Sequence, residues 1–197
     1  MKLLFVNACM RGEESRTLKL CRKYIETFMT SKEDEEWVLE EVDLNETDVK
    51  MLDREMLLKR DRLMTEGNTD DSMFDLAKQL MSVDHVLIGA PYWDLAFPAK
   101  LKAYLEQCCV TGLTFIYNEK GIPEGQCQAK DLTYVTTSGG VIGDFNFGYD
   151  YIKGLCLLFG IGSTHFVAAE GLDIWGCDGD NVMAEAEKNI TEIVNKL

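Results

Sequence analysis

Apolar and polar residues alternate along this chain with two different periods. Five short runs are apolar or alternate every second residue, which is typical of β-strands. Longer segments between them carry apolar residues at every third or fourth position, as on one face of a helix. The predicted strands are Leu3–Ala8, Trp37–Leu44, His85–Ala90, Leu132–Thr137 and His165–Ala169.

Helical periodicity predicts the segments that connect these strands. One helix begins at Pro98, because proline suits the first turn of a helix, and the last is capped by Asp178 or Asp180. A short apolar run, Leu113–Tyr117, precedes a turn at Gly121–Gly125. The other predicted helices are one with an apolar face of Leu18, Cys21, Ile25 and Phe28, then Val49–Met64, Asp70–Met81, Asn146–Phe159 and Asn181–Val194.

The order of these elements predicts the fold class. Alternating strands and helices favour parallel strands joined by right-handed crossovers, with helices on both faces of the sheet. Five such strands in 197 residues predict an α/β, flavodoxin-like five-stranded parallel sheet with strand order 2-1-3-4-5. We expect residues 1–197 to form a single domain, because no repeat, low-complexity tract or linker interrupts the pattern.

Composition and charge narrow the choice of partners. The net charge of −14 argues against binding to nucleic acid or to an anionic membrane surface. The N-terminal MKLLFVNACMRGEESR lacks the apolar stretch of about 7–15 residues that a signal peptide needs. No run approaches the roughly 20 apolar residues of a membrane-spanning helix. Seven cysteines without metal-ligand spacing suit a reducing compartment, so we expect a cytoplasmic protein without a bound metal.

A ligand of such a sheet binds beyond the carboxyl ends of the strands, beside the first strand. The segment after the first predicted strand, Ala8–Thr17, contains Ser15 and Thr17 around a predicted helix start, with Arg16 between them. Free N–H groups and the positive end of the helix dipole make such a start a natural anion site. Ser15 as a simple N-cap is the alternative. The glycine signatures of nucleoside triphosphate and dinucleotide sites are missing.

Two further segments leave strands at the same edge. Tyr92 and Trp93 follow the third strand, where they would either line a flat ligand or seal the loop against the sheet. Gly139 and Gly140 follow the fourth strand, where they would either allow close approach of a ligand or form a plain turn. A helix start that suits a phosphate, two aromatic side chains and a pair of glycines that lets a ligand come close would together suit a flat ring system with a phosphate tail, such as FMN.

Several motifs resemble those of the flavodoxin-like FMN-dependent NAD(P)H:quinone oxidoreductases and azoreductases. The family segment P-M-Y-N-F-x-x-P-A-x-L-K-x-Y-I-D is similar to PYWDLAFPAKLKAYLE, from Pro91 to Glu106. GLTFIYNEKGIPEG, starting at Gly112, resembles the family's G-V-T-F-x-Y-T-E-x-G-P-x-G and is one residue longer. TTSGG ending at Gly140 resembles T-S-R-G-G, and AEG ending at Gly171 matches as it stands.

The resemblance implies a cofactor, a site and an assembly. FMN would be the cofactor, NAD(P)H the co-substrate, a small aromatic acceptor the second substrate, and a homodimer the assembly. The phosphate would be held by Ser15, Arg16 and Thr17, and the isoalloxazine ring by Pro91, Tyr92, Trp93, Asp94, Leu95, Thr137, Ser138, Gly139 and Gly140. The acceptor pocket would contain Trp93, Phe115 and Tyr117.

Three positions depart from the family pattern. Asp94 stands where the family carries Asn, and Ser138 where it carries Arg, so the ring environment gains a negative charge and loses a positive one. Both changes are expected to lower the potential of a bound flavin. Cys9 lies in the first loop, where the family tends to have Ser.

The sequence therefore predicts an enzyme that passes hydride from NAD(P)H to FMN and then to a quinone, azo or similar aromatic acceptor, by a ping-pong scheme. No side chain is expected to act as an obligatory acid or base, since the flavin carries the chemistry. His85 and His165 are expected to be structural. An electron carrier without NAD(P)H turnover and a flavin-binding regulatory protein are the alternatives.

Overall fold

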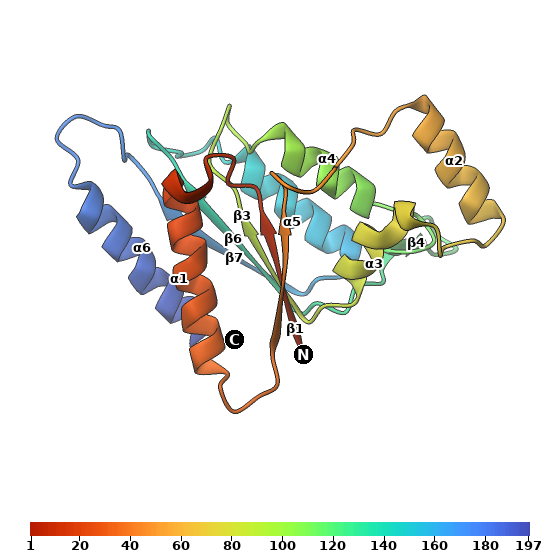
Figure 1. Cartoon of the computed structure of the whole chain (residues 1–197), viewed down its shortest axis with the longest axis horizontal. Coiled ribbons are helices and arrows are strands. Elements are labelled where there is room, and N and C mark those ends of the chain that lie inside the picture. Colours follow the sequence, from red (N-terminus) through yellow and green to blue (C-terminus); the bar gives the residue numbers. More distant parts are fainter.

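The computed structural model describes residues 1–197 and contains one large parallel sheet (Figure 1). Its strands lie in the order β2-β1-β3-β6-β7. Numbered among themselves, these five strands have the order 2-1-3-4-5, so the predicted flavodoxin-like topology is confirmed. Their bounds are β1 Lys2–Asn7, β2 Val38–Asp43, β3 His85–Gly89, β6 Asp131–Thr137 and β7 Ser163–Ala169.

Helices cover both faces of this sheet (Figure 1). On one face lie α1 (Arg16–Ser31) and α6 (Gly179–Val194), which pack on Leu3 and Phe5 of β1. On the other face, α4 (Ala99–Cys108) and α5 (Phe147–Phe159) pack on Leu4 and Val6. Successive residues of β1 thus serve two cores, which is why the central strands read as unbroken apolar runs.

Two predicted helices begin later than expected because aspartates cap them. Asp53 Oδ1 accepts a hydrogen bond from the Met56 N–H at 2.8 Å, so α2 is Arg54–Thr65 and the predicted start at Val49 is wrong. Asp71 caps the short 3₁₀ turn η2 (Ser72–Phe74), which leads into α3 (Asp75–Met81). Capping carboxylates mark a helix start more sharply than apolar periodicity does. Of the two candidate caps of α6, the structure uses Asp178.

A small antiparallel hairpin lies outside the large sheet. Its strands are β4 (Phe115–Tyr117) and β5 (Pro123–Gly125), where the sequence predicted only an apolar run and a turn. Gly125 contacts the backbone at the end of α5 so closely that a Cβ atom would lie 1.9 Å from the carbonyl carbon of Phe159. Because α5 ends where β7 is about to begin, this hairpin lies at the amino ends of the parallel strands.

At the opposite edge of the sheet lie the loops that leave the carboxyl ends of the five parallel strands. The crevice of a doubly wound sheet is found at this edge, and the loops after β1, β3, β6 and β7 contribute to it here. No helix combines the length and the apolar character that crossing a membrane requires.

Candidate functional site

A cavity of about 200 Å³ opens at the carboxyl edge of the sheet, where the loops after β1, β3, β6 and β7 meet. Most of its lining residues were predicted from the sequence as ligand-binding, and they come from three separate loops. The lining consists of Arg11, Glu14, Ser15, Arg16, Thr17, Pro91, Tyr92, Trp93, Thr137, Gly139 and Asp173. Only two of these side chains are hydrophobic, so the cavity suits a polar or charged ligand.

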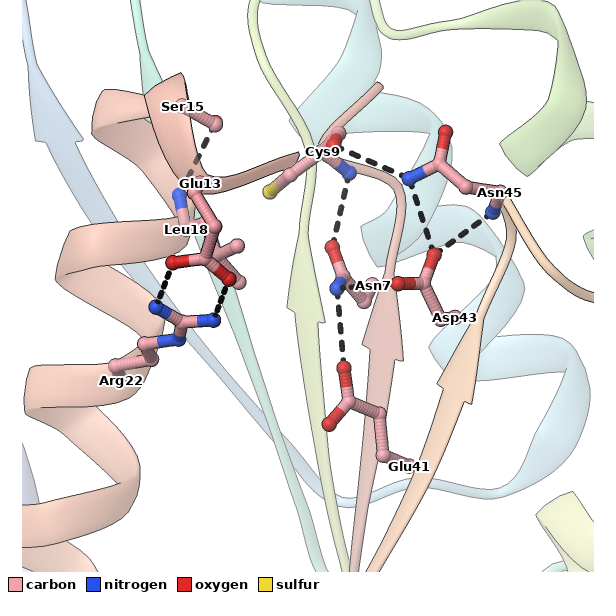
Figure 2. Close-up of polar contacts among 9 residues, drawn as sticks. All are labelled: Asn7, Cys9, Glu13, Ser15, Leu18, Arg22, Glu41, Asp43 and Asn45. Carbon is pink, nitrogen blue, oxygen red and sulfur yellow. Dashed lines mark hydrogen bonds and ion pairs between the residues drawn. The ribbon is translucent and has the colours of Figure 1, made fainter. Parts of the chain in front are cut away.

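The N-terminus of α1 supplies hydrogen-bond donors to this cavity. Ser15 is the N-cap, and its Oγ accepts from the Leu18 N–H at 3.2 Å, which leaves its own proton free to donate (Figure 2). The N–H groups of Arg16 and Thr17 have no acceptor within the protein. Unpaired donors at the positive end of a helix dipole favour an anion. The N-cap role and an anion-binding role of Ser15 are therefore compatible.

Two asparagines fix the start of the loop that leads to this helix (Figure 2). Asn7, buried at the end of β1, accepts from the Cys9 N–H at 3.0 Å and donates to Glu41 of β2. Asn45 donates to the Cys9 carbonyl at 3.3 Å and to Asp43. Cys9 is held on both sides of its backbone, so the loop leaves the sheet in one direction.

The acidic residues at and near this loop make different contacts. Glu13, in the 3₁₀ turn η1 (Gly12–Glu14) before α1, makes a two-pronged ion pair with Arg22 of α1, and this hydrogen bonding lowers the pKa of Glu13 (Figure 2). Glu13 is therefore engaged away from the cavity, whereas Glu14 lines it. Arg16 reaches across the cavity to Asp173, with 2.9 Å between Nη1 and Oδ1. Hydrogen bonding to Arg16 lowers the pKa of Asp173.

Thr17 joins the helix to the sheet. Its hydroxyl lies 2.7 Å from the hydroxyl of Thr137 at the end of β6, and the side chain of Thr17 is fully buried. The hydroxyl is thus already engaged with a protein partner. We expect Thr17 to meet a ligand through its backbone N–H.

The aromatic residues after β3 stand on a tight turn. Asp94 and Leu95 have φ angles of 50° and 69°, and Trp93 and Ala96 exchange backbone hydrogen bonds across them. Left-handed geometry is unfavourable for a residue such as leucine, and conformations of this kind cluster at ligand sites. Tyr92 is anchored by its N–H to Thr137 and by its hydroxyl to the carbonyl of Phe145 at 3.0 Å.

The loop after β6 is joined to the loop after β7. Backbone N–H groups of Gly171, Leu172 and Asp173 donate to the carbonyls of Gly140, Ser138 and Gly139. A Cβ atom on Gly139 would lie 2.3 Å from Asp173 Oδ2, so any larger residue at this position would require the Asp173 carboxylate to move. Nothing lies within 4 Å of the corresponding point on Gly140.

The remaining predicted site residues lie outside the cavity lining. Asp94, Leu95, Ser138 and Gly140 flank residues that line it. Phe115 and Tyr117 lie in the hairpin at the other edge of the sheet, so the structure does not bring them to this cavity within one chain. The reason is that β5 packs against the end of α5 and not against its start.

Sequence reasoning missed Asp173. The candidate ligand segments in the sequence follow β1, β3 and β6, whereas Asp173 lies in the loop that follows β7. The AEG motif that ends at Gly171 marks the start of that loop, so an acidic residue two positions later was a signal that could have been followed.

The two histidines stand apart from the cavity. His85 begins β3 and is buried, with its Nε2 at 2.9 Å from the hydroxyl of Tyr24. Burial, and to a smaller degree the charges of His165 and Lys32, lowers the pKa of His85 to about 3. His165 in β7 lies 3.5 Å from Asp131. Neither histidine lines the cavity, which agrees with the predicted structural roles.

Comparison with known proteins gives a consistent family. The sequence profile of a family described by its flavodoxin-like fold matches residues 1–194. A protein of Clostridium acetobutylicum named FMN-dependent NADH:quinone oxidoreductase 2 is 31% identical over 188 residues, which cover 92% of each chain. An FMN-dependent NADH:quinone oxidoreductase of Clostridium perfringens is 29% identical over 197 residues, covering 98% of this chain and 96% of that protein.

Solved structures share the fold. An azoreductase from Bacillus anthracis superposes with a TM-score of 0.88 at 21% identity and full coverage of both chains. An FMN-dependent NADH-azoreductase from the same organism, solved in complex with FMN, has a TM-score of 0.85 at 22% identity, with 99% of this chain and 98% of that chain covered.

Proposed function

The chain belongs to the family with the flavodoxin-like fold, and on that premise we propose that it is an FMN-dependent oxidoreductase, which transfers hydride from NAD(P)H to a quinone, azo or similar aromatic acceptor. Two relatives that match over nearly the whole chain are named as FMN-dependent NADH:quinone oxidoreductases. These names favour the enzyme over an electron carrier without NAD(P)H turnover. We also propose that residues 1–197 form one flavin-binding domain.

The observation that carries this proposal is the composition of the cavity. The lining includes the cap hydroxyl of Ser15 and the unpaired N–H groups of Arg16 and Thr17, which suit the single phosphate of FMN. It also includes Tyr92 and Trp93, which suit a flat aromatic ring. Both groups line one cavity, so the residues present fit the cofactor.

When bound, FMN supplies the hydride chemistry, and the protein supplies binding, orientation and electrostatics. Ser15 and the start of α1 would hold the phosphate and so fix the position of the whole cofactor. Tyr92, tied to Thr137 and Phe145, would hold the ring in one plane. Trp93 is 40% exposed at the rim of the cavity, where it would stack with an aromatic acceptor.

A homodimer is part of the proposal. The exposed aromatic rings of Phe145 and Phe147 lie next to each other, and Phe145 accepts the hydrogen bond of the anchored Tyr92. Adjacent exposed aromatic side chains of this kind mark interaction surfaces. Tyr117 is 56% exposed and would reach an acceptor only from a second copy of the chain, whereas Phe115 is buried in its own chain and would support Tyr117. Sedimentation of the flavin-loaded protein should give the mass of a dimer, and a monomer would remove Phe115 and Tyr117 from the acceptor pocket.

A cytoplasmic location is proposed because all seven cysteines are free thiols.

The first test is the identity of the cofactor. Flavin extracted from the purified protein should be FMN, because the cavity offers one phosphate site at one helix start. Chromatography of the extract distinguishes FMN from FAD. With FMN bound, oxidation of NADH should depend on an added quinone. Recovery of FAD, or a folded protein that takes up neither flavin, would disprove the proposal.

Asp94→Asn should raise the midpoint potential of the bound flavin. Asparagine adopts the left-handed conformation of this turn as readily as aspartate, so the turn should persist. The substitution removes a negative charge beside Trp93, and that charge disfavours the reduced cofactor. Because Asp94 is exposed, solvent screens the effect, and we expect a rise on the order of 20 mV, about 1 kcal/mol for two electrons. A redox titration that finds an equal or lower potential would show that this carboxylate does not influence the ring.

A further inference from the structure

Asp173 combines three features that the proposed function does not explain. It lines the cavity, it forms an ion pair with Arg16, and its carboxylate fills the space that Gly139 leaves open. The two arginines of the lining, Arg11 and Arg16, are matched by the two carboxylates of Glu14 and Asp173. A cavity with the donors for a phosphate dianion therefore has no net positive charge from its side chains.

The position of Asp173 is fixed by the backbone. Its N–H donates to the Gly139 carbonyl at 3.0 Å, and the neighbouring Leu172 N–H donates to Ser138 at 3.1 Å. The guanidinium of Arg16 is held from the same loop, since Nη1 also donates to the Leu172 carbonyl at 3.4 Å. The ion pair therefore joins the start of α1 to the loop after β7, across the mouth of the cavity.

From this geometry we propose that Asp173 is a specificity-determining residue, which competes with the ligand phosphate for Arg16 and so limits the affinity for a dianionic phosphate. The inference rests on the proposed function, because it concerns the phosphate of FMN at the same site. A phosphate that contacts the start of α1 either displaces the carboxylate from Arg16 or lies near a like charge. Both cost free energy that an asparagine would not cost. Asp173 should thus lower the affinity for FMN and leave the affinity for riboflavin, which lacks the phosphate, unchanged.

The test is a binding titration of the flavin-free protein by flavin fluorescence. Asp173→Asn should bind FMN about tenfold more tightly than wild type, and riboflavin equally well. The expected gain is only tenfold because the side chain of Asp173 is 67% exposed and solvent screens its charge. The matched control is Asp144→Asn, which removes one exposed negative charge from a residue that has no ion pair and does not line the cavity. That control should leave both affinities within twofold of wild type.

A second variant tests whether Asp173 and the ligand phosphate compete for Arg16. In the wild-type background, where Arg16 is engaged by Asp173, Arg16→Gln should weaken FMN binding only slightly. In the Asp173→Asn background, the loss of FMN affinity caused by Arg16→Gln should be about tenfold larger. An FMN affinity of Asp173→Asn equal to or below that of wild type would overturn the inference while the proposed function stands. Equal gains for FMN and riboflavin would also overturn it, because the effect would then not involve the phosphate. A wild-type protein that binds neither flavin would overturn both.

Discussion

Replacing Ser15 by aspartate is expected to weaken FMN binding by orders of magnitude and to leave the fold as stable as before. Aspartate caps a helix as well as serine does, so its carboxylate can accept the Leu18 N–H that Ser15 now accepts. The new charge would stand where we propose that the phosphate binds. Two like charges about 4 Å apart repel by roughly 4 kcal/mol at an effective dielectric constant near 20, which corresponds to a loss of about a thousandfold in affinity.

Two companion variants separate the roles of Ser15. Ser15→Asn keeps the cap without a charge and should bind FMN within about tenfold of wild type. Ser15→Ala loses the cap and should lower the free energy of unfolding by about 1 kcal/mol, in addition to weakening FMN. Riboflavin should bind all three variants similarly. If Ser15→Asp binds FMN as tightly as Ser15→Asn does, the phosphate does not lie at the start of α1.

The second large effect is a loss of stability in mild acid. His85 stays neutral in the folded protein down to about pH 3, whereas the imidazole of the unfolded chain takes up a proton near pH 6.5. Between these values the unfolded state binds more protons, so stability falls as the pH falls. The contribution of His85 is complete above pH 6.5, and about 2 kcal/mol of it should be lost at pH 5, from about 1.4 kcal/mol per pH unit.

Urea unfolding at pH 5, 5.5, 6 and 6.5 measures this slope (roughly the window above the carboxylate titrations). His85→Gln should be less stable than wild type at pH 6.5, because the bond to the Tyr24 hydroxyl is altered, but its stability should depend much less on pH. His165→Gln is the control, because His165 is only partly buried, and it should retain most of the slope. Equal slopes in wild type and His85→Gln would mean that His85 can be protonated without unfolding.

The sheet was predictable because its strands are buried on both faces. In β1 and β3 almost every side chain enters one of the two cores. These strands therefore appear in the sequence as short, continuous apolar runs that are readily recognised as strands. The order of the strands then followed from general rules of connection. The start of α2 was not predictable from periodicity, because Val49 is partly buried in a core although it precedes the helix.

The candidate site was predictable in outline and not in its details. Ser15, Tyr92 and Gly139 follow strands whose carboxyl ends meet, so sequence position alone brings them to one edge. The space above Gly139 is filled by the side chain of Asp173, which is more than thirty residues away in the chain. Sequence position alone does not reveal this contact. The position of the hairpin that carries Phe115 could not be predicted for a similar reason, since it depends on the close contact between Gly125 and Phe159.

The most direct test of the account is an anaerobic experiment with the two substrates added in turn. The FMN-loaded protein is mixed with one equivalent of NADH, and the yellow colour of the oxidised flavin is followed. The colour should disappear rapidly, and a quinone added afterwards without more NADH should restore it. A protein that keeps its colour with NADH and NADPH, yet is bleached by a chemical reductant, would be an electron carrier and would contradict the account.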